Sequence, residues 1–114
     1  MTTVTFHSAD SRLDGFAVEG HSGYAEEGSD IVCAAISAAV GLTECTVNEV
    51  MGISAAVKTD EKRARVSLKL PPALNEESES LCQNVLTGLM VYLRSLGEEY
   101  PDNLTVLLDD DDED

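Results

Sequence analysis

A cysteine and a histidine that are able to act together lie close to each other in the first third of the chain. Asp30 is a good helix N-cap residue, and an apolar-periodic run begins directly after it. This places Cys33 as the third residue of a helix, where free backbone N–H groups and the helix dipole favour a thiolate. His21 lies in a loop flanked by Gly20 and Gly23, which permit backbone conformations that bring its ring to the helix start. The window therefore contains a candidate nucleophile and its base.

Each of these residues also has a simpler interpretation. An unpaired cysteine such as Cys33 is most often a small buried hydrophobic residue, and we expect this of Cys45 and Cys82. His21 would then only fit a turn. His7 is a rival base, but it alternates with the core positions of the first strand, which predicts a surface position.

Two further polar residues near the cysteine have alternative roles. Asp30 either caps the helix or orients His21 as a third catalytic residue, and one carboxylate does not easily do both. Ser37 lies one helical turn after Cys33 and either hydrogen-bonds His21 or the substrate, or bonds back to a carbonyl of the preceding turn.

Two motifs carry a resemblance to a known family. They read Gly20-His21-Ser22-Gly23 and Ser29-Asp30-Ile31-Val32-Cys33-Ala34-Ala35-Ile36-Ser37. Together with chain length and element order, they resemble the ribosomal-processing cysteine proteases. This resemblance covers the whole chain except its acidic C-terminal run.

The resemblance implies a function and a set of site residues. The expected activity is that of a cysteine endopeptidase that removes the N-terminal extension of a large-subunit ribosomal protein, with consecutive Phe residues before the cut. Cys33 would be the nucleophile and His21 the proton donor and base, with Gly20, Asp30 and Ser37 as supporting positions. A homodimer is implied as well, and we expect an apolar substrate cleft beside residues 20–29.

Composition restricts the other possible classes. The formal net charge is −15, and six of these charges come from the run 109–114. Phosphate backbones would be repelled, so we expect no direct nucleic-acid binding, whereas a basic protein partner would be attracted. The tail either serves solubility alone or steers such a partner. No signal peptide and no membrane span are predicted, and three cysteines without a close pair are typical of a reducing compartment, so we predict a cytoplasmic protein.

The pattern of apolar residues predicts seven elements. Residues 2–8 and a segment around Phe16 and Val18 alternate as strands, and so do segments around 53–57, 66–70 and 104–108. Helices are predicted from about 30 to 51 and from Asn75 to about Gly97. Their buried stripes are expected at the following positions: Val32, Ile36, Val40, Thr43, Val47 and Val50 in the first helix, and Leu81, Val85, Leu89, Tyr92, Leu93 and Leu96 in the second.

This order predicts an α+β fold of two layers. The elements run ββαββαβ, which favours a mostly antiparallel five-stranded sheet with two helices on one face. We expect one domain over residues 1–108 and a disordered acidic tail over 109–114. The long loop 20–29 is expected to be mobile, with Gly23 and Gly28 as hinges.

No cofactor or metal is predicted, because the histidines and cysteines lack paired zinc-ligand spacing and the glycines match no phosphate-binding motif. One alternative belongs to another class of protein. It is a non-catalytic acidic module that binds a basic ribosomal or ribosome-assembly protein, with Cys33 packed in the core.

Overall fold

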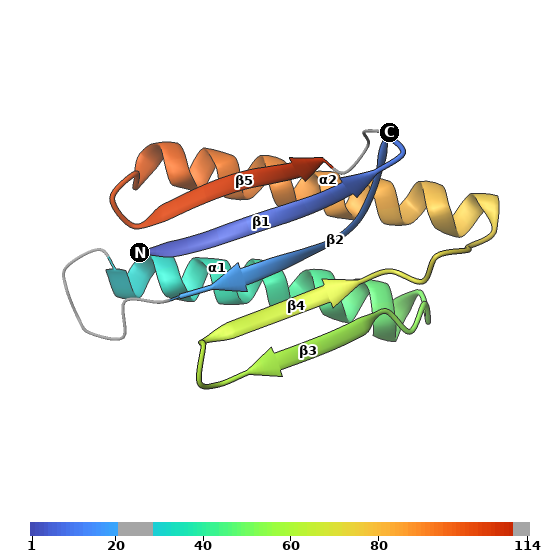
Figure 1. Cartoon of the computed structure of the whole chain (residues 1–114), viewed down its shortest axis with the longest axis horizontal. Helices are drawn as coiled ribbons and strands as arrows, with labels where there is room; N and C mark the ends of the chain where they lie inside the picture. Colours follow the sequence, from blue (N-terminus) through green and yellow to red (C-terminus); the bar gives the residue numbers. More distant parts are fainter. Residues whose placement is uncertain (21–28, 111–114) are drawn as a thin grey trace.

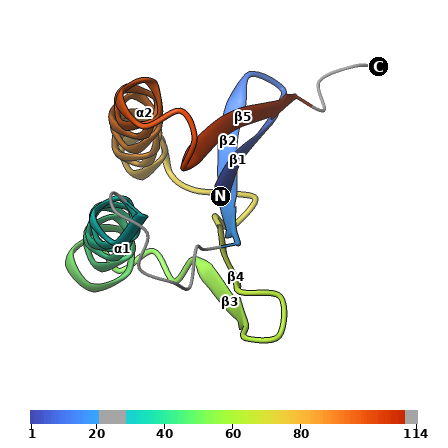
Figure 2. The same cartoon turned by 90° about the vertical axis from the view of Figure 1, so that its left-hand side faces the viewer.

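The computed structural model of the chain describes residues 1–20 and 29–110. Its elements, in order, are β1 (Thr2–Ala9), β2 (Arg12–Glu19), α1 (Ser29–Glu44), η1 (Cys45–Val50), β3 (Ala56–Asp60), β4 (Arg65–Lys69), α2 (Glu76–Glu99) and β5 (Leu104–Asp110). One sheet lies beneath one layer of helices, and both helices cover the same face (Figure 1, Figure 2). The predicted α+β fold and element order are confirmed.

The sheet has the strand order β3-β4-β2-β1-β5. β1 pairs with β5 in parallel, and every other neighbouring pair is antiparallel. Gly15 permits the close approach of β2 and β4, because a Cβ there would lie 2.2 Å from the carbonyl oxygen of Leu68. β2 ends and α1 begins at the same end of the molecule (Figure 1). The sheet therefore brings the chain on either side of residues 21–28 to one end of the fold.

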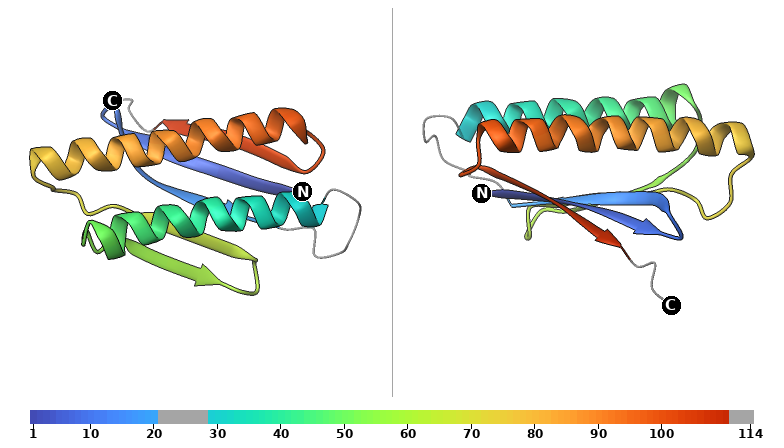
Figure 3. Two further views of the ribbon diagram at one scale, coloured as in Figure 1. Left: turned by 180° about the vertical axis from the view of Figure 1, so that it is seen from behind. Right: turned by 90° about the horizontal axis from the view of Figure 1, so that it is seen from above.

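The core lies between the sheet and the helix layer, which Figure 3 shows from above. Buried residues of β1 and β2 face it, and the rings of Phe6 and Phe16 contact each other in a tilted arrangement, with centroids 5.6 Å apart and planes at 42°. α1 contributes Val32 and Ile36, and α2 contributes Leu86, Leu89 and Leu93, all less than 10% exposed. Burial of these side chains from strands and helices together fixes the helices over the sheet.

The first helical segment differs from the prediction at its C-terminal end. The last turns form a π-helix, in which the Met51 N–H donates to the Thr46 carbonyl at 2.9 Å. The Asn48 side chain then pairs with both backbone groups of Ala55, at 2.7 and 3.2 Å. Gly52 follows at φ +69°, as expected for the residue after a helix. The wider turn moves Val50 to the surface, 75% exposed, so its predicted place in the core is wrong.

The buried stripe of α2 is rotated relative to the prediction. Cys82 and Leu86 are buried with Leu89, Leu93 and Leu96, whereas the predicted Leu81 and Tyr92 are about half exposed and Val85 is only partly buried. Two apolar stripes lie next to each other on this helix, and contact with the sheet selects one of them. The second stripe faces α1 and solvent.

The end of α2 also differs from the prediction. The predicted N-cap is confirmed, since the Ser78 N–H donates to Asn75 Oδ1 at 2.8 Å. Gly97 was predicted to follow the helix, but α2 continues to Glu99 and is capped by Tyr100. Gly97 instead permits the close return of β5, because a Cβ there would lie 3.3 Å from the Leu104 carbonyl oxygen. This glycine therefore serves tertiary packing and not helix termination.

The last strand is longer than predicted. β5 continues to Asp110, where Asp109 and Asp110 pair with His7 and Ser8 of β1. The first two acidic residues of the predicted tail are therefore part of the sheet. The remaining tail residues, 111–114, lie outside the described part of the chain.

The segment Ile31–Val50 is long and apolar enough to span a membrane by length and composition alone. The expectation that no such segment exists is therefore wrong. The scattered Ser, Thr and Glu residues leave its mean hydropathy at 1.6, which is high enough for a membrane-spanning helix. In this fold the segment packs on the sheet along one side, and 22% of its most apolar window is buried. Much of its apolar surface consequently remains exposed.

Candidate active site

Cys33 lies near the start of α1 with its side chain partly buried. Its neighbour Val32 and the following Ile36 are buried against the sheet, which places Cys33 on one flank of the helix and not in the core contact itself. The fully buried position of a purely structural cysteine is therefore not observed. A thiol on this flank is able to meet a substrate without unfolding of the helix.

The start of α1 lies two residues before the predicted first helical residue, Ile31. The helix begins at Ser29, so Asp30 is its second residue and Cys33 is its fifth, not its third. Helical geometry then pairs the Cys33 N–H with the Ser29 carbonyl. The unpaired N–H groups of the helix start are those of residues before Val32. The predicted N-cap role of Asp30 is therefore wrong, because this residue lies inside the first turn of α1.

Ser37 lies on nearly the same side of α1 as Cys33. The two residues are four positions apart, about 40° around the helix axis. Ser37 is exposed. Its hydroxyl is therefore accessible on the flank that carries the thiol, which is compatible with its predicted supporting role.

Gly20, the residue directly before the predicted base His21, has a constrained backbone conformation. Its φ is +85°, and a Cβ there would lie 2.8 Å from the Met1 carbonyl oxygen, so no other residue fits without strain. Its N–H donates to the Ala64 carbonyl at 3.0 Å, and its own carbonyl accepts from Thr2 Oγ1 at 3.4 Å. The supporting role predicted for Gly20 thus has a backbone rationale.

His21, Gly23 and Gly28 lie among residues 21–28, outside the described residues. The pairing of His21 with Cys33, the two hinges and the mobility of this loop therefore stay predictions. The same holds for the apolar cleft expected beside the loop.

The rival base His7 is on the wrong face of the molecule. It follows the outward-facing Thr3 and Thr5 on β1, opposite to the face that carries α1, and its Nδ1 lies 3.4 Å from Asp109 Oδ2. The prediction of a surface histidine is confirmed. His7 is unable to reach Cys33 because the sheet separates them.

The other two cysteines differ from each other. Cys82 is fully buried, as predicted, and burial raises the pKa of its thiol, helped by the negative charge of Glu79 and opposed by Arg12. Cys45 is exposed, so the prediction that it is buried is wrong. It begins the π-helical turn, where the phase of the helix changes and its side chain turns toward solvent. Within residues 1–20 and 29–110, no three His, Cys, Asp or Glu side chains cluster as a metal site would require.

Sequence reasoning missed the distribution of positive charge. Five of the seven basic residues lie in the hairpin of β3 and β4, namely Lys58, Lys62, Arg63, Arg65 and Lys69. This hairpin is bonded to Gly20 through Ala64, and both Arg63 and Arg65 approach the carboxylate of Glu19 at 3.5 Å. A local charge count along the sequence would have found this basic hairpin, which the net charge conceals. The strand that leads to the predicted base therefore ends next to positive charge.

Comparison with known proteins supports a protease. The family model described as "Cysteine protease Prp" matches residues 1–105. The ribosomal processing cysteine protease Prp of Bacillus subtilis is 29% identical over 99 residues, which cover 87% of this chain and 88% of that protein.

Solved structures share the fold. The SMU.848 protein of Streptococcus mutans matches with a TM-score of 0.84 at 23% identity, covering 96% of this chain and 95% of that one. The ribosomal processing protease Prp of S. aureus, bound to a covalently linked product peptide, matches with a TM-score of 0.73 at 26% identity and covers 95% and 99%. The same protease in complex with a substrate peptide gives a TM-score of 0.76 at 23% identity and covers 95% and 99%.

Proposed function

The chain belongs to the cysteine protease Prp family and is a cysteine protease; on this basis we propose that it removes the N-terminal extension of a large-subunit ribosomal protein by a Cys-His mechanism. The observation that carries the proposal is a partly buried Cys33 near the start of α1, on a chain whose family match spans residues 1–105. The non-catalytic binding module considered from sequence is set aside, because the family is one of proteases.

The proposed reaction begins with proton transfer. His21 takes the proton of the Cys33 thiol, and the thiolate attacks the scissile carbonyl carbon. The resulting oxyanion collapses to a thioester as the peptide nitrogen leaves, and His21 returns the proton to this amine. Water then attacks the thioester, again with His21 as base, and releases the new carboxylate and the free thiol.

The helix start is the proposed source of oxyanion stabilisation. A partial positive charge and unpaired N–H groups lie there, ahead of Val32. The Cys33 N–H does not take this role in the proposal, because helix geometry pairs it with the Ser29 carbonyl. Amides of the first turn, or of the segment before it, therefore take this role in the proposal.

The position of Gly20 supports the proposed role of His21. Gly20 is fixed by hydrogen bonds to Ala64 and Thr2, and His21 is the next residue. β2 ends at the end of the molecule where α1 begins (Figure 1), and Gly20 directly follows β2 while Cys33 lies near the start of α1. Because Asp30 is not the N-cap, its role in the proposal is to orient His21, and Ser37 supports the substrate or the histidine.

The proposed partners are a basic ribosomal protein and a second copy of the chain. A net charge of −15 attracts a basic substrate and lowers the affinity for RNA outside the basic hairpin. We place the reaction in the cytoplasm, where free thiols persist, and it requires no cofactor.

The test uses the host's own ribosomal protein. Purified enzyme is incubated with this protein in its full-length form, and the new N-terminus is read by mass spectrometry. We expect one cut after consecutive Phe residues, lost in Cys33→Ala and retained in Cys45→Ala, which removes the exposed thiol of the same helical segment. Cleavage that persists in Cys33→Ala would exclude the cysteine mechanism, and an intact ribosomal protein would exclude this substrate.

A further inference from the structure

The basic hairpin, formed by β3, β4 and the turn between them, carries a local surplus of positive charge. Five of the seven basic residues of the chain lie within residues 58–69, together with only two of its 22 acidic residues, Asp60 and Glu61. The net charge of −15, from which we expected phosphate backbones to be repelled, averages over the whole chain and conceals this segment. A positive surface on an acidic protein indicates a site for an anionic partner.

The three lysines of the hairpin are available to such a partner. Lys58, Lys62 and Lys69 are exposed, and none of them forms an ion pair with any other residue of the described ranges 1–20 and 29–110. The Asp60 carboxylate stabilises the turn itself, because it accepts from the backbone N–H groups of Lys62 and Arg63 at 3.1 and 3.3 Å. Among these residues, the three ammonium groups are therefore left for a ligand from outside the chain.

Strand register gathers these charges on one face of the sheet. Arg65 and Lys69 point to the same face because they are four residues apart on β4, and Lys58 pairs with the residue midway between them. Such diagonal neighbours lie about 7–8 Å apart. Leu68 points the other way and is buried in the core, so the cations face away from the helices. A hollow of about 650 Å³ at the turn is lined by Lys58, Lys62 and Arg65, among others.

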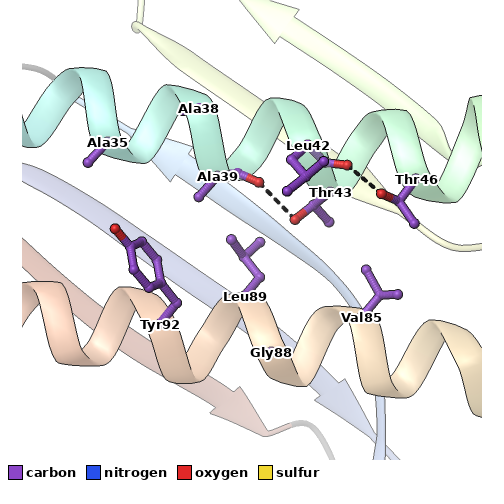
Figure 4. Close-up of a pocket in the computed structure, with 10 residues that line it drawn as sticks. All are labelled: Ala35, Ala38, Ala39, Leu42, Thr43, Thr46, Val85, Gly88, Leu89 and Tyr92. Atoms are coloured by element: carbon purple, nitrogen blue, oxygen red, sulfur yellow. Dashed lines mark hydrogen bonds between the residues drawn. The ribbon is translucent and has the colours of Figure 1, made fainter.

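The helix layer on the other side of the sheet has a different character. The groove between α1 and α2 is lined by uncharged residues, with Leu42 and Thr43 on α1 and Leu89 and Tyr92 on α2 (Figure 4). Its Thr43 hydroxyl already donates to the Ala39 carbonyl at 2.9 Å (Figure 4). An anion is therefore attracted by the hairpin and not by this groove.

The types of basic residue favour phosphate over carboxylate as the ligand. Carboxylates are best recognised by the two-pronged guanidinium of arginine, and both arginines of the hairpin, Arg63 and Arg65, already approach the Glu19 carboxylate at 3.5 Å. Lysine binds phosphate as a compact point charge. Residues 56–69 contain no aromatic side chain on which a base could stack, so contact with a nucleic acid would be made through its backbone.

Screening reduces the repulsion that the rest of the chain exerts. The Debye length is about 8 Å at physiological ionic strength. The molecule measures 44 × 32 × 26 Å. Asp109 and Asp110 lie on β5, at the opposite edge of the sheet from β3, and four strand spacings separate these edges by about 19 Å. A phosphate at the hairpin therefore responds mainly to the charges near it.

We propose that the basic hairpin binds the phosphate backbone of RNA. The choice of RNA rests on the proposed function, because a ribosomal protein is an RNA-binding substrate and brings RNA to the enzyme. The turn of the hairpin lies toward the end of the molecule where α1 begins (Figure 1). Its Ala64 carbonyl accepts from the N–H of Gly20, the residue before His21. RNA on the hairpin would thus hold an RNA-bound substrate at the end of the fold that carries Cys33.

Fluorescence anisotropy of a labelled RNA duplex, titrated with the full chain at several NaCl concentrations, tests the proposal. Contacts from three lysines should give a slope of about −2 to −3 for log Kobs against log[NaCl]. Lys62→Gln should weaken binding about 5-fold and flatten the slope by about 1, and Lys58→Gln combined with it should flatten the slope by about 2. The matched control Arg94→Gln makes the same change in net charge at an exposed position of α2 and should bind RNA like the wild type.

Three outcomes would overturn the assignment. These are a wild type that does not bind the duplex, equal weakening by Lys62→Gln and Arg94→Gln, and displacement of the RNA by polyglutamate at equal charge concentration, which would assign the hairpin to an acidic protein. Cleavage of the free ribosomal protein is measured with the same variants, and Lys62→Gln should leave it unchanged. A chain that cleaves without binding RNA would overturn the hairpin assignment alone, and a chain that binds RNA without cleaving would overturn the proposed function alone.

Discussion

Gly20 and Ala64 are joined by a backbone hydrogen bond of 3.0 Å between the end of β2 and the turn of the β3–β4 hairpin. The bond fixes the residue directly before the predicted base His21. Because Gly20 also has φ +85° and lies close to the Met1 carbonyl, its conformation is determined by two segments that are distant in sequence, the N-terminus and the β3–β4 turn. A backbone position of this kind connects the sheet to the predicted catalytic loop.

Gly20→Ala should lower both stability and turnover. The new Cβ would meet the Met1 carbonyl at 2.8 Å in a backbone conformation that disfavours side chains, which costs about 1–3 kcal/mol of unfolding free energy. We expect displacement of the chain at this point to misplace His21, so that kcat/KM for the ribosomal substrate falls at least about 10-fold. A 10-fold fall corresponds to about 1.4 kcal/mol of lost transition-state stabilisation. Chemical denaturation and steady-state cleavage measure the two effects.

Gly52→Ala is the matched control for this change. Gly52 has a similar φ of +69°, but nothing lies within 4 Å of a Cβ there and the residue follows η1. We expect about 1 kcal/mol of destabilisation with unchanged kcat/KM. Equal losses of turnover in both variants would show that Gly20 acts only through stability.

The thiols should be alkylated in a fixed order. Cys45 is exposed, so we expect it to react with iodoacetamide in the native protein, and Cys45→Ser removes this labelling before Cys33 is followed. In this background Cys33 should be labelled in the native state and Cys82 only after unfolding, because Cys82 is fully buried. Peptide mapping by mass spectrometry reads each site. Native labelling of Cys82 ahead of Cys33 would contradict the packing described.

Burial of Cys82 predicts a loss of stability at high pH. Its folded-state pKa is raised, so the unfolded thiol ionises first. The unfolded state therefore binds fewer protons than the folded state above about pH 8.5, and the unfolding free energy falls as pH rises from there through the folded-state pKa. Cys82→Ala removes this term, so its unfolding free energy should change less between pH 8.5 and 10 than that of the wild type. Urea denaturation at several pH values measures the difference, and parallel curves would contradict it.

The Gln83 side chain hydrogen-bonds both backbone groups of Leu13 in the β1–β2 hairpin, as a neighbouring strand would. Its Oε1 accepts from the Leu13 N–H and its Nε2 donates to the Leu13 carbonyl, both at 2.8 Å. Gln83→Leu should destabilise the fold by about 1–3 kcal/mol, because two partly buried backbone groups lose their partner. Asn84→Leu, at the next and exposed position, should stay within about 0.5 kcal/mol of wild type. Thermal unfolding compares the two variants.

The sequence determined the element types and their order through local patterns. Strand alternation, the Asn75 cap, Gly52 after the first helical segment and the turn residues all act over a few residues, and the fold follows from layering two hairpins, two helices and a last strand. The candidate pair His21 and Cys33 could also be recognised from the sequence, because glycines flank the histidine and a helix-start pattern precedes the cysteine.

Only the tertiary structure decided which apolar faces were buried and what the glycines do. α2 carries two adjacent apolar stripes, and contact with the sheet selected the one through Cys82 and Leu86, leaving Leu81 and Tyr92 about half exposed. A Cβ at Gly20 or Gly97 would lie 2.8 or 3.3 Å from the carbonyl oxygen of Met1 or Leu104, and no local sequence pattern predicts such contacts between distant residues. Local propensity fixes what a segment forms, whereas burial depends on neighbours that the chain brings together only when it folds.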